Sequence, residues 1–316
     1  MHEVLEKIGS IGIVPVIKID DPEKAVPLAR ALIAGGIPCA EITFRTAQGI
    51  EAVRRIAAEV PEILLGAGTV LTVEQAEAAC SAGAKFVVSP GFNKKVVNRC
   101  LEKGIPVVPG CANPSDIECA LEAGLEVVKF FPAEQSGGLD YIKAVAAPYG
   151  GIRFMPTGGI NAGNIARYTA YEKVLACGGS WMAGADLMDS GAFEKITALC
   201  REAVNTMLGF TLVHVGINGE SETGAMAGAD RFAALFGFAV KPGSSSVFAG
   251  GGIEITKTPG RGKQGHIALA AWSVPKAAAC LERLGAVLDY GNAKRGPSGE
   301  LTVIYLAEEI LGFAVH

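Results

Sequence analysis

The most constraining feature of this sequence is a strand–helix unit that recurs eight times in its first 207 residues. Short apolar runs rich in valine and isoleucine, such as 13–18 and 125–130, alternate with amphipathic stretches of helical length. Several of these stretches end at a glycine directly before the next run, as at Gly83, Gly104 and Gly124, which is typical of a helix C-cap. Because the runs are apolar almost throughout, both faces of the sheet must be covered. Eight such units favour a closed (β/α)8 TIM barrel over an open, doubly wound α/β sheet.

The boundaries of the expected elements follow from the apolar runs and from the turn residues between them. We expect strands at 13–18, 38–44, 63–67, 85–89, 105–109, 125–130, 152–156 and 173–177. Helices are expected at 2–9, 21–34, 46–59, 72–82, 93–103, 114–123, 138–146, 161–169 and 191–207. The sequence therefore predicts one α/β domain over residues 1–207.

Composition and charge exclude several classes of function. The chain of 316 residues has a net charge of −4, which gives no basic footprint for nucleic acid. No apolar run reaches the roughly 20 residues that span a bilayer. The eight cysteines are scattered without a CxxC pair, as expected for free thiols in a reducing compartment. We therefore expect a cytoplasmic protein that binds neither nucleic acid nor membrane.

Lys129 is an unusual residue for its surroundings. It lies in the middle of the otherwise apolar run 127–131, and a lysine is rarely buried without a partner or a role. Burial disfavours the ammonium form and so favours the amine as a nucleophile. Lys129 is therefore either a Schiff-base residue on a barrel strand or a lysine whose charged end reaches water at the strand end.

The end of the second expected strand offers further polar groups. Active sites of TIM barrels lie at the carboxyl ends of the strands, where Glu41, Thr43 and Arg45 alternate and so share one face. The barrel region contains one histidine, His2, so a general base further along must be a carboxylate, tyrosine, cysteine or lysine. Glu41 fits this role and is also an ion-pair candidate for Lys129 or Arg45. The guanidinium of Arg45 suits a bidentate grip on a substrate carboxylate.

Paired glycines follow the seventh and eighth expected strands. The sequences 157–159 (Thr-Gly-Gly) and 178–180 (Gly-Gly-Ser) stand where TIM barrels usually bind phosphate. Glycines there let backbone N–H groups approach an anion, although a Gly-Gly pair is also a common tight turn. A lysine nucleophile, a carboxylate base, an arginine and a phosphate cradle together describe imine chemistry on a phosphorylated keto acid, with no metal required.

Seven motifs connect this region to a known family. They are Val14-Pro15-Val16-Ile17, Glu41-Ile42-Thr43-Phe44-Arg45-Thr46, Gly66-Ala67-Gly68-Thr69-Val70-Leu71, Val88-Ser89-Pro90-Gly91, Lys129-Phe130-Phe131-Pro132-Ala133-Glu134, Pro156-Thr157-Gly158-Gly159-Ile160 and Gly178-Gly179-Ser180-Trp181. Through these motifs, residues 10–207 resemble the bacterial 2-keto-3-deoxy-6-phosphogluconate aldolases, which also act on 4-hydroxy-2-oxoglutarate. The resemblance implies a class I aldolase of carbohydrate metabolism (the Entner–Doudoroff pathway) that is a homotrimer and uses no cofactor.

The resemblance also implies roles for individual residues. Lys129 is the implied Schiff-base residue, and Glu41 is the implied proton shuttle. The residues expected to bind substrate are Arg45, Thr69, Pro90 and Phe131 around the pyruvyl part, Thr157 at the strand end, and Gly158, Gly159, Gly179 and Ser180 near the phosphate. The implied products are pyruvate and glyceraldehyde 3-phosphate. The 6-phosphogalactonate epimer and unphosphorylated 4-hydroxy-2-oxoglutarate, which gives glyoxylate, are the alternative substrates.

A different pattern begins after residue 207. We expect a strand at 212–217, a helix at 225–236 and strands at 238–240, 245–249 and 252–257. The same order then repeats, with a strand at 266–270, a helix at 274–284 and strands at 287–290, 301–306 and 311–315. Two βαβββ units indicate an internal duplication, so the sequence predicts a separate α+β domain over residues 208–316.

This layout resembles the glyoxalase or vicinal-oxygen-chelate fold, in which each half supplies a histidine and a glutamate to one divalent metal. His214, Glu254 and His266 match three ligand positions. The fourth falls near Val315, which has no ligand atom, and strand alternation would place the neighbouring His316 on the opposite face. The alternatives are a site for zinc or a similar ion, a metal-free module, and a module that reports a small ligand to the barrel. A binding protein in which a retired barrel serves this module is the contrasting class of function.

Overall fold

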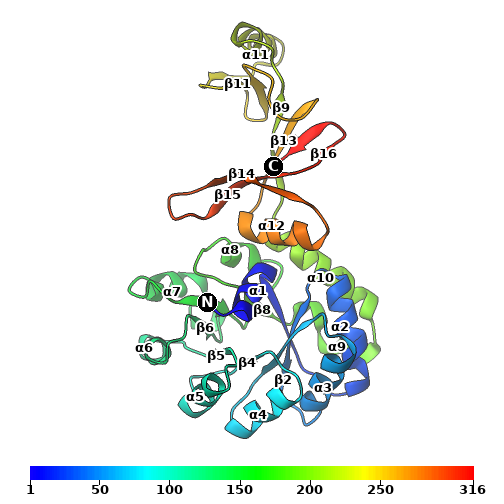
Figure 1. The fold of residues 1–316 in the computed structure, drawn as a ribbon, viewed down its shortest axis with the longest axis vertical. Helices are drawn as coiled ribbons and strands as arrows, with labels where there is room; N and C mark the ends of the chain where they lie inside the picture. The colour runs from blue at the N-terminus through cyan, green and yellow to red at the C-terminus, as the bar shows by residue number, and fades with distance from the viewer. The chain divides into compact units, whose positions relative to one another are not determined.

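The computed structural model describes all residues from 1 to 316, and the chain divides into two compact units, Met1–Met207 and Leu208–His316. The first unit carries the repeated strand–helix pattern, and the second carries a mixed sheet with two helices (Figure 1). None of the helices combines the length and the apolar character that a membrane crossing requires.

The first unit contains eight strands, each followed by helical structure. The strands are β1 (Ile13–Ile17), β2 (Cys39–Thr43), β3 (Leu64–Gly68), β4 (Phe86–Val88), β5 (Val107–Val108), β6 (Val127–Phe130), β7 (Arg153–Pro156) and β8 (Cys177–Gly179). The helices are α1 (Glu3–Ile11), α2 (Ala25–Ala34), α3 (Gly49–Glu59), α4 (Val73–Ser81), α5 (Lys94–Glu102), α6 (Pro114–Glu122), α7 (Gly138–Ala146), α8 (Ile165–Thr169), α9 (Ala185–Ser190) and α10 (Phe193–Leu208). Short 3-10 turns lie at Pro22–Lys24, Glu134–Ser136 and Trp181–Ala183.

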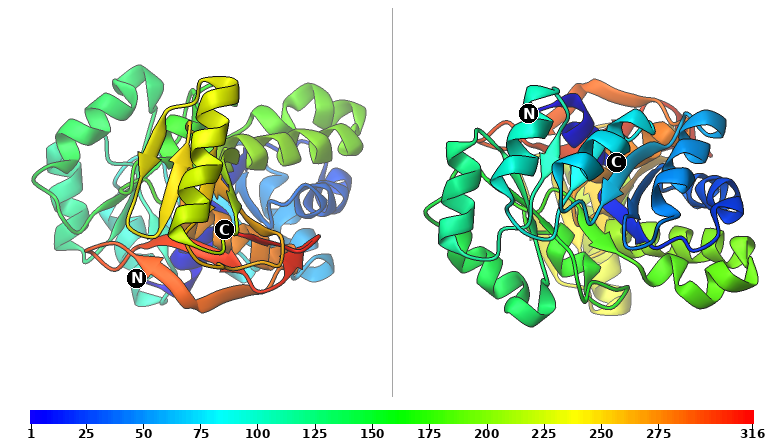
Figure 2. Two further views of the ribbon diagram at one scale, coloured as in Figure 1. Left: turned by 90° about the horizontal axis from the view of Figure 1, so that it is seen from above. Right: turned by 90° about the horizontal axis from the view of Figure 1, so that it is seen from below.

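The eight parallel strands follow one another in sequence order around a TIM-barrel-like ring. One ladder has the order β5-β4-β3-β2-β1-β8, and β6 pairs with β7 in a second ladder. Single parallel bridges join the two ladders, between Gly110 and Lys129 on one side and between Thr157 and Gly178 on the other. In Figures 1 and 2 the helices of this unit lie around the outside of the strands. The parallel sheet expected from the apolar strands is therefore confirmed in a TIM-barrel-like form.

Local signals start several barrel helices directly after the strand ends. Thr72 and Gln75 form a capping box at the start of α4, which satisfies two backbone donors reciprocally. The side chains of Asn93 and Asn113 accept backbone N–H groups at the starts of α5 and α6, and each such cap stabilises a helix by about 1 kcal/mol. The loops at the carboxyl ends of β3, β4 and β5 are consequently short and well defined.

The eighth strand was placed too early in the sequence-based prediction. β8 begins at Cys177 rather than ending there, because Gly178 pairs with Val14 of β1. Of residues 173–176, which were expected in the strand, only Val174 forms a bridge. Gly178 and Gly179, which were expected in the loop after this strand, are thus strand residues, since their backbone completes the ladder with β1.

The second unit begins with a strand, a helix and three strands in the expected order. These elements are β9 (Thr211–Ile217), α11 (Glu222–Phe236), β10 (Val240–Pro242), β11 (Ser246–Ala249) and β12 (Ile253–Thr256). α11 packs its small residues Ala225 and Ala229 against Val247 and Ile255 of the sheet. That helix therefore covers one face of this half of the sheet.

The second half of this unit has four strands after its helix, where the expected βαβββ order has three. Its elements are β13 (Gly265–Ala270), α12 (Val274–Arg283), β14 (Leu288–Arg295), β15 (Leu301–Leu306), β16 (Glu309–Ile310) and β17 (Phe313–Val315). The sheet has the order β10-β11-β12-β9-β13-β17-β16, while β14 and β15 form a separate hairpin. The hairpin packs Leu288, Leu301 and Ile304 against Ala278 of α12, so it buries its apolar residues on the helix.

Candidate active site

A buried ion pair lies inside the barrel. Lys129 of β6 is 5% exposed and Glu41 of β2 is fully buried. The Nζ atom of Lys129 donates to Oε1 of Glu41 at 3.2 Å. Because both charged side chains are almost wholly buried, the pair lies in a largely dry interior. A lysine that reaches water from the strand end is excluded, because its charged group meets a carboxylate inside the barrel.

Glu41 has an unused acceptor. Its Oε2 atom is buried and has no hydrogen-bond partner, although buried polar atoms are almost always satisfied. The carboxylate lies over the backbone of Gly68, where a Cβ atom would collide with it. Gly68 therefore makes room for the carboxylate, and the free oxygen is available to a proton of a substrate or a water.

Two neighbours of the ion pair have unusual environments. Nζ of Lys129 lies 5.6 Å from the ring centroid of Phe131. Thr69, which directly follows Gly68, has a φ of 58°. Positive φ values are strongly disfavoured for β-branched residues and cluster at functional sites. Pro90 is separated from Lys129 by the segment after β5. The carbonyl of Pro90 packs against Gly110 in that segment, and Gly110 is the bridge partner of Lys129.

A cavity of about 300 Å³ opens at the carboxyl ends of the strands, next to the ion pair. It contains many of the residues predicted from the sequence: Arg45, Phe131, Thr157, Gly158, Gly159, Gly179 and Ser180. Lys129, Glu41, Thr69 and Pro90 are not among its lining residues. Phe131 links the two regions, because it lines the cavity and also faces Nζ of Lys129.

The basic side chains that line this cavity differ in whether they already have a partner within the protein. Lys18 forms an ion pair with Asp20 at 2.8 Å, and Lys24 donates to the carbonyl of Asp189 at 2.8 Å. Arg45 lines the cavity, is exposed, and has no hydrogen bond or ion pair within the protein. Its guanidinium is therefore the cation best placed to bind an external carboxylate bidentately. Lys18 was expected at the carboxyl end of the first strand, but neither Lys18 nor Lys24 was predicted to bind substrate.

The glycines after β7 and β8 are required by their surroundings. Gly158 and Gly159 have φ values of 100° and 78°, which glycine adopts without strain. A Cβ at Gly178 would collide with Oγ1 of Thr157, and one at Gly179 would collide with the ring of Trp181. Backbone groups therefore form this wall of the cavity.

The thiols near the site are poor candidates for its base. Burial, with a smaller contribution from Glu41, raises the pKa of Cys39 far above its usual range. Burial also raises the pKa of Cys111 to about 12. Neither thiol deprotonates near neutral pH, so Glu41 is the better candidate for a base beside Lys129.

The second unit contains a separate cluster of imidazoles and a carboxylate. His214 Nε2 lies 2.9 Å and His266 Nε2 lies 3.1 Å from Oε2 of Glu254, and the two imidazole nitrogens are 3.0 Å apart. The structure thus brings together all three residues that were predicted as ligands. Gly216 permits this arrangement, because a Cβ there would collide with the ring of His266.

His316 also belongs to this cluster, so its expected placement on the opposite face was wrong. The ligand atoms of His214, His266 and His316 all lie within 4.8 Å of one another. The register of β13 with β17 pairs His266 with Ala314, and strand alternation then puts residue 316 on the same face. Burial, with nearby histidines and Lys294, lowers the pKa of His316 to about 4, which keeps its imidazole neutral near pH 7.

Comparison with known proteins identifies the first unit. The family described as KDPG and KHG aldolase matches residues 4–199. The chain belongs to this family. The 2-dehydro-3-deoxy-phosphogluconate aldolase of Treponema pallidum (strain Nichols) is 52% identical over 204 residues, which are 65% of this chain and 97% of that protein. The KHG/KDPG aldolase of Escherichia coli (strain K12) is 44% identical over 200 residues, which are 63% of this chain and 94% of that protein.

A solved structure of the same family agrees with this assignment. The KDPG aldolase of Legionella pneumophila, crystallised with pyruvate as a covalent carbinolamine intermediate, has a TM-score of 0.61 and 36% identity. The match covers 63% of this chain and 97% of that chain. Because the family match ends at residue 199, it covers the first unit, and the glyoxalase-like fold of residues 208–316 stays a prediction.

Proposed function

We propose that the first unit is a class I aldolase, a lyase that cleaves 2-keto-3-deoxy-6-phosphogluconate into pyruvate and glyceraldehyde 3-phosphate and also cleaves 4-hydroxy-2-oxoglutarate. The observation that carries this proposal is the buried pair of Lys129 and Glu41 beside a cavity with a free arginine. The names of the relatives and the covalent pyruvate intermediate of the Legionella enzyme support the same reaction.

The ion pair supplies both groups that imine chemistry needs. Transfer of one proton from Lys129 to Glu41 leaves a neutral amine, which attacks the C2 ketone of the substrate and forms a carbinolamine. Glu41 gives the proton that it took from Lys129 to the departing hydroxyl, and loss of water leaves a protonated imine that accepts the electron pair of the C3–C4 bond. Glu41 takes the proton of the C4 hydroxyl as that bond breaks and the aldehyde leaves, and it returns a proton to C3 of the enamine. Hydrolysis of the imine then releases pyruvate.

The remaining predicted residues divide the cavity into two parts. Arg45 binds the substrate carboxylate, while Thr69, Pro90 and Phe131 enclose the pyruvyl part. The backbone walls after β7 and β8 bind the phosphate: Thr157, Gly158, Gly159, Gly179 and Ser180. The lining of the cavity by Arg45 and by these backbone walls supports this division.

Pyruvate release tests the proposed reaction directly. A lactate dehydrogenase-coupled assay should show cleavage of 2-keto-3-deoxy-6-phosphogluconate and slower cleavage of 4-hydroxy-2-oxoglutarate, with the 6-phosphogalactonate epimer as comparison. The resemblance also implies a trimer, so light scattering should give the active species three times the chain mass of 32.6 kDa. No pyruvate from any of the three substrates would overturn the reaction, and a monomer mass would overturn the trimer.

For the second unit we propose a site for one divalent metal ion. His214, Glu254 and His266 supply two imidazoles and a carboxylate whose ligand atoms converge within about 3 Å. His316 offers a fourth nitrogen on the same face. Two or three nitrogens and one carboxylate oxygen suit zinc. Such an ion would supply Lewis-acid chemistry, and the four side chains would hold it; a metal-free module is the alternative.

Elemental analysis of the full chain tests this site. We expect about one zinc ion per chain after purification with added zinc, and clear loss of zinc in His266→Ala and in His214→Ala. His2→Asn is the matched control, because His2 caps α1 and asparagine can keep the cap. Chelation with EDTA should remove the ion while leaving pyruvate release largely unchanged. Zinc well below one equivalent in the wild type would favour the metal-free module.

A further inference from the structure

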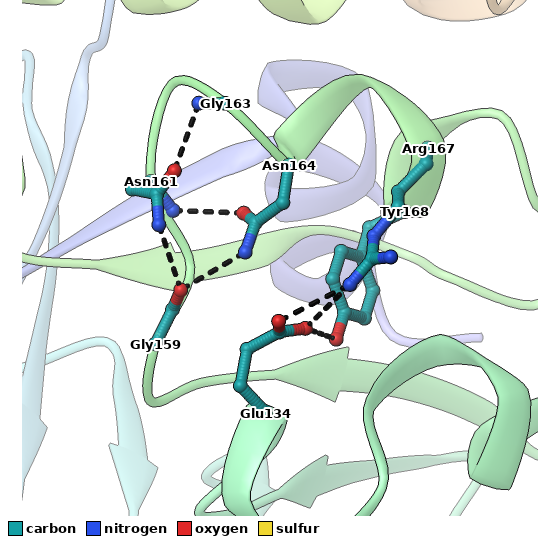
Figure 3. Close-up of polar contacts among 7 residues, drawn as sticks. All are labelled: Glu134, Gly159, Asn161, Gly163, Asn164, Arg167 and Tyr168. Carbon is teal, nitrogen blue, oxygen red and sulfur yellow. Dashed lines mark hydrogen bonds and ion pairs between the residues drawn. The ribbon is translucent and has the colours of Figure 1, made fainter.

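Three successive peptide groups after β7 share an unusual arrangement of their carbonyl groups. The carbonyl of Thr157 accepts from the backbone N–H of Ala133 at 2.8 Å, and that of Gly158 accepts from the N–H of Glu134 at 3.1 Å. The carbonyl of Gly159 accepts from two side-chain amides, Nδ2 of Asn161 at 3.1 Å and Nδ2 of Asn164 at 3.0 Å (Figure 3). All three carbonyl groups are therefore held by donors of the surrounding chain.

The N–H groups of these three peptides point away from the segments that hold the carbonyl groups. In a trans peptide the C=O and N–H groups point in opposite directions, and the only cis peptide bond in the chain is Phe131-Pro132. The N–H groups of Gly158, Gly159 and Ile160 consequently point away from the donors that hold the carbonyls. The N–H of Gly158 points toward the carbonyl of Gly178, because Thr157 and Gly178 form a parallel bridge. The N–H groups of Gly159 and Ile160 have no hydrogen bond within the protein, and both residues line the cavity. The loop therefore presents two successive free donors, an arrangement that binds anions.

The two asparagines are themselves fixed in orientation. Oδ1 of Asn164 accepts from the backbone N–H of Asn161 at 2.9 Å, and Oδ1 of Asn161 accepts from the N–H of Gly163 at 2.8 Å. Each amide thus uses its oxygen within residues 161–163 and its nitrogen on the carbonyl of Gly159, as Figure 3 shows. These side-chain bonds explain why α8 begins at Ile165 and not at residue 161 as expected.

A second contact supports the loop from the side of β6. A Cβ on Gly159 would lie 2.6 Å from Cβ of Glu134, so the two segments pack without space. The carboxylate of Glu134 accepts from Nη2 of Arg167 at 2.9 Å and from the hydroxyl of Tyr168 (Figure 3). These contacts tie the segment after β6 to α8 and leave the loop little freedom to move.

We propose that Asn161 and Asn164 are positioning residues of the phosphate site. They hold the peptide between Gly159 and Ile160 so that the N–H of Ile160 becomes a donor to the substrate phosphate, beside the N–H of Gly159. This inference rests on the proposed function of the first unit and goes beyond it, because neither asparagine is placed to touch the reacting carbons. Loss of either side-chain amide should weaken binding of the phosphoryl group and leave the imine chemistry intact.

Asn164→Asp is the sharpest variant, because it keeps the shape of the side chain and the acceptor for Asn161 while removing the donor to Gly159. We expect kcat/KM for 2-keto-3-deoxy-6-phosphogluconate to fall about tenfold, mainly through KM, as for loss of one hydrogen bond to a charged group. For 4-hydroxy-2-oxoglutarate, which has no phosphate, the change should be less than about twofold. Asn164→Ala removes the same donor without adding a charge. We expect kcat/KM for the phosphorylated substrate to fall in this variant as well.

The matched control makes the same chemical change at an exposed asparagine of α5. Asn98→Asp should leave kcat/KM for both substrates unchanged, because Asn98 lies on the outer surface of its helix. An equal loss for both substrates in Asn164→Asp and Asn164→Ala would indicate a purely structural role and overturn the inference. Unchanged KM for the phosphorylated substrate would overturn it as well.

A direct binding measurement separates this inference from the proposed reaction. Calorimetric titration with inorganic phosphate should show binding to the wild type and at least threefold weaker binding to both Asn164 variants, on the order expected for one lost hydrogen bond. This readout does not depend on turnover, so a wild type that binds phosphate but cleaves no substrate would contradict the reaction alone. Equal phosphate affinity in the wild type and the variants would contradict the role of the asparagines.

Discussion

Lys129→Arg should lower kcat for cleavage of 2-keto-3-deoxy-6-phosphogluconate by about 10⁴-fold or more, the scale of losing a covalent nucleophile. Arginine keeps a positive charge beside Glu41, but its guanidinium stays protonated and cannot attack a ketone. Lys129→Met would remove the charge and leave the carboxylate of Glu41 buried without a counter-ion, at a cost of about 3–5 kcal/mol of stability. Arginine is therefore the first variant and methionine the second.

The coupled pyruvate assay measures this loss, and thermal unfolding followed by circular dichroism reports whether the barrel is retained. Lys95→Arg makes the same substitution at an exposed lysine of α5 and should keep wild-type activity. Retention of more than about a hundredth of the wild-type kcat in a folded Lys129→Arg protein is incompatible with a lysine nucleophile at this position.

Glu41→Gln should lower kcat by about 10²- to 10⁴-fold, the usual contribution of general acid–base catalysis. Glutamine has nearly the same shape as glutamate, and its Oε1 atom can still accept from Nζ of Lys129, so packing over Gly68 is preserved. What it loses is the ability to take a proton from the C4 hydroxyl and to return one to C3. The variant should therefore form the imine with pyruvate but exchange the protons at C3 poorly.

Proton NMR in deuterium oxide isolates that step. The wild type should replace the methyl protons of pyruvate with deuterium, and Glu41→Gln should do so at least about a hundredfold more slowly. Glu59→Gln, at an exposed glutamate near the end of α3, is the control and should exchange at the wild-type rate. Wild-type exchange in Glu41→Gln would assign the proton shuttle to another group.

The ion pair at the centre of the site follows from the sequence because each partner stands out locally. Lys129 and Glu41 are single charged residues inside apolar runs, and the count of strands places both at the same end of one barrel. Their separation of 88 residues along the chain carries no local signal. It becomes a contact only through the parallel order of the strands, which the alternation of strands and helices does predict.

Features that depend on register could not be predicted in the same way. The face of His316 depends on the pairing of β13 with β17, and the start of β8 depends on its pairing with β1. A shift of one residue reverses the face of every side chain in a strand, and no local pattern fixes these two registers. The hairpin of β14 and β15 leaves the sheet because α12 covers its apolar side, a choice made by tertiary packing.

The asparagines after Gly159 were overlooked for a related reason. Asn161 and Asn164 lie in a stretch expected to begin a helix, where an asparagine reads as a cap or a surface residue. Their spacing of three residues after a Gly-Gly pair is the one signal that the sequence offered. Its meaning depends on where the carbonyl of Gly159 points, and that direction is set by contacts with the segment after β6.

Borohydride trapping with pyruvate tests the central claim most directly. Reduction of the imine makes the bond between the substrate and the lysine permanent, and peptide mass spectrometry then locates the modified residue. We predict one pyruvate-derived adduct per chain, on Lys129, and none in Lys129→Arg. A wild-type protein that forms no adduct, or one that carries it on a different lysine, would contradict the proposed mechanism.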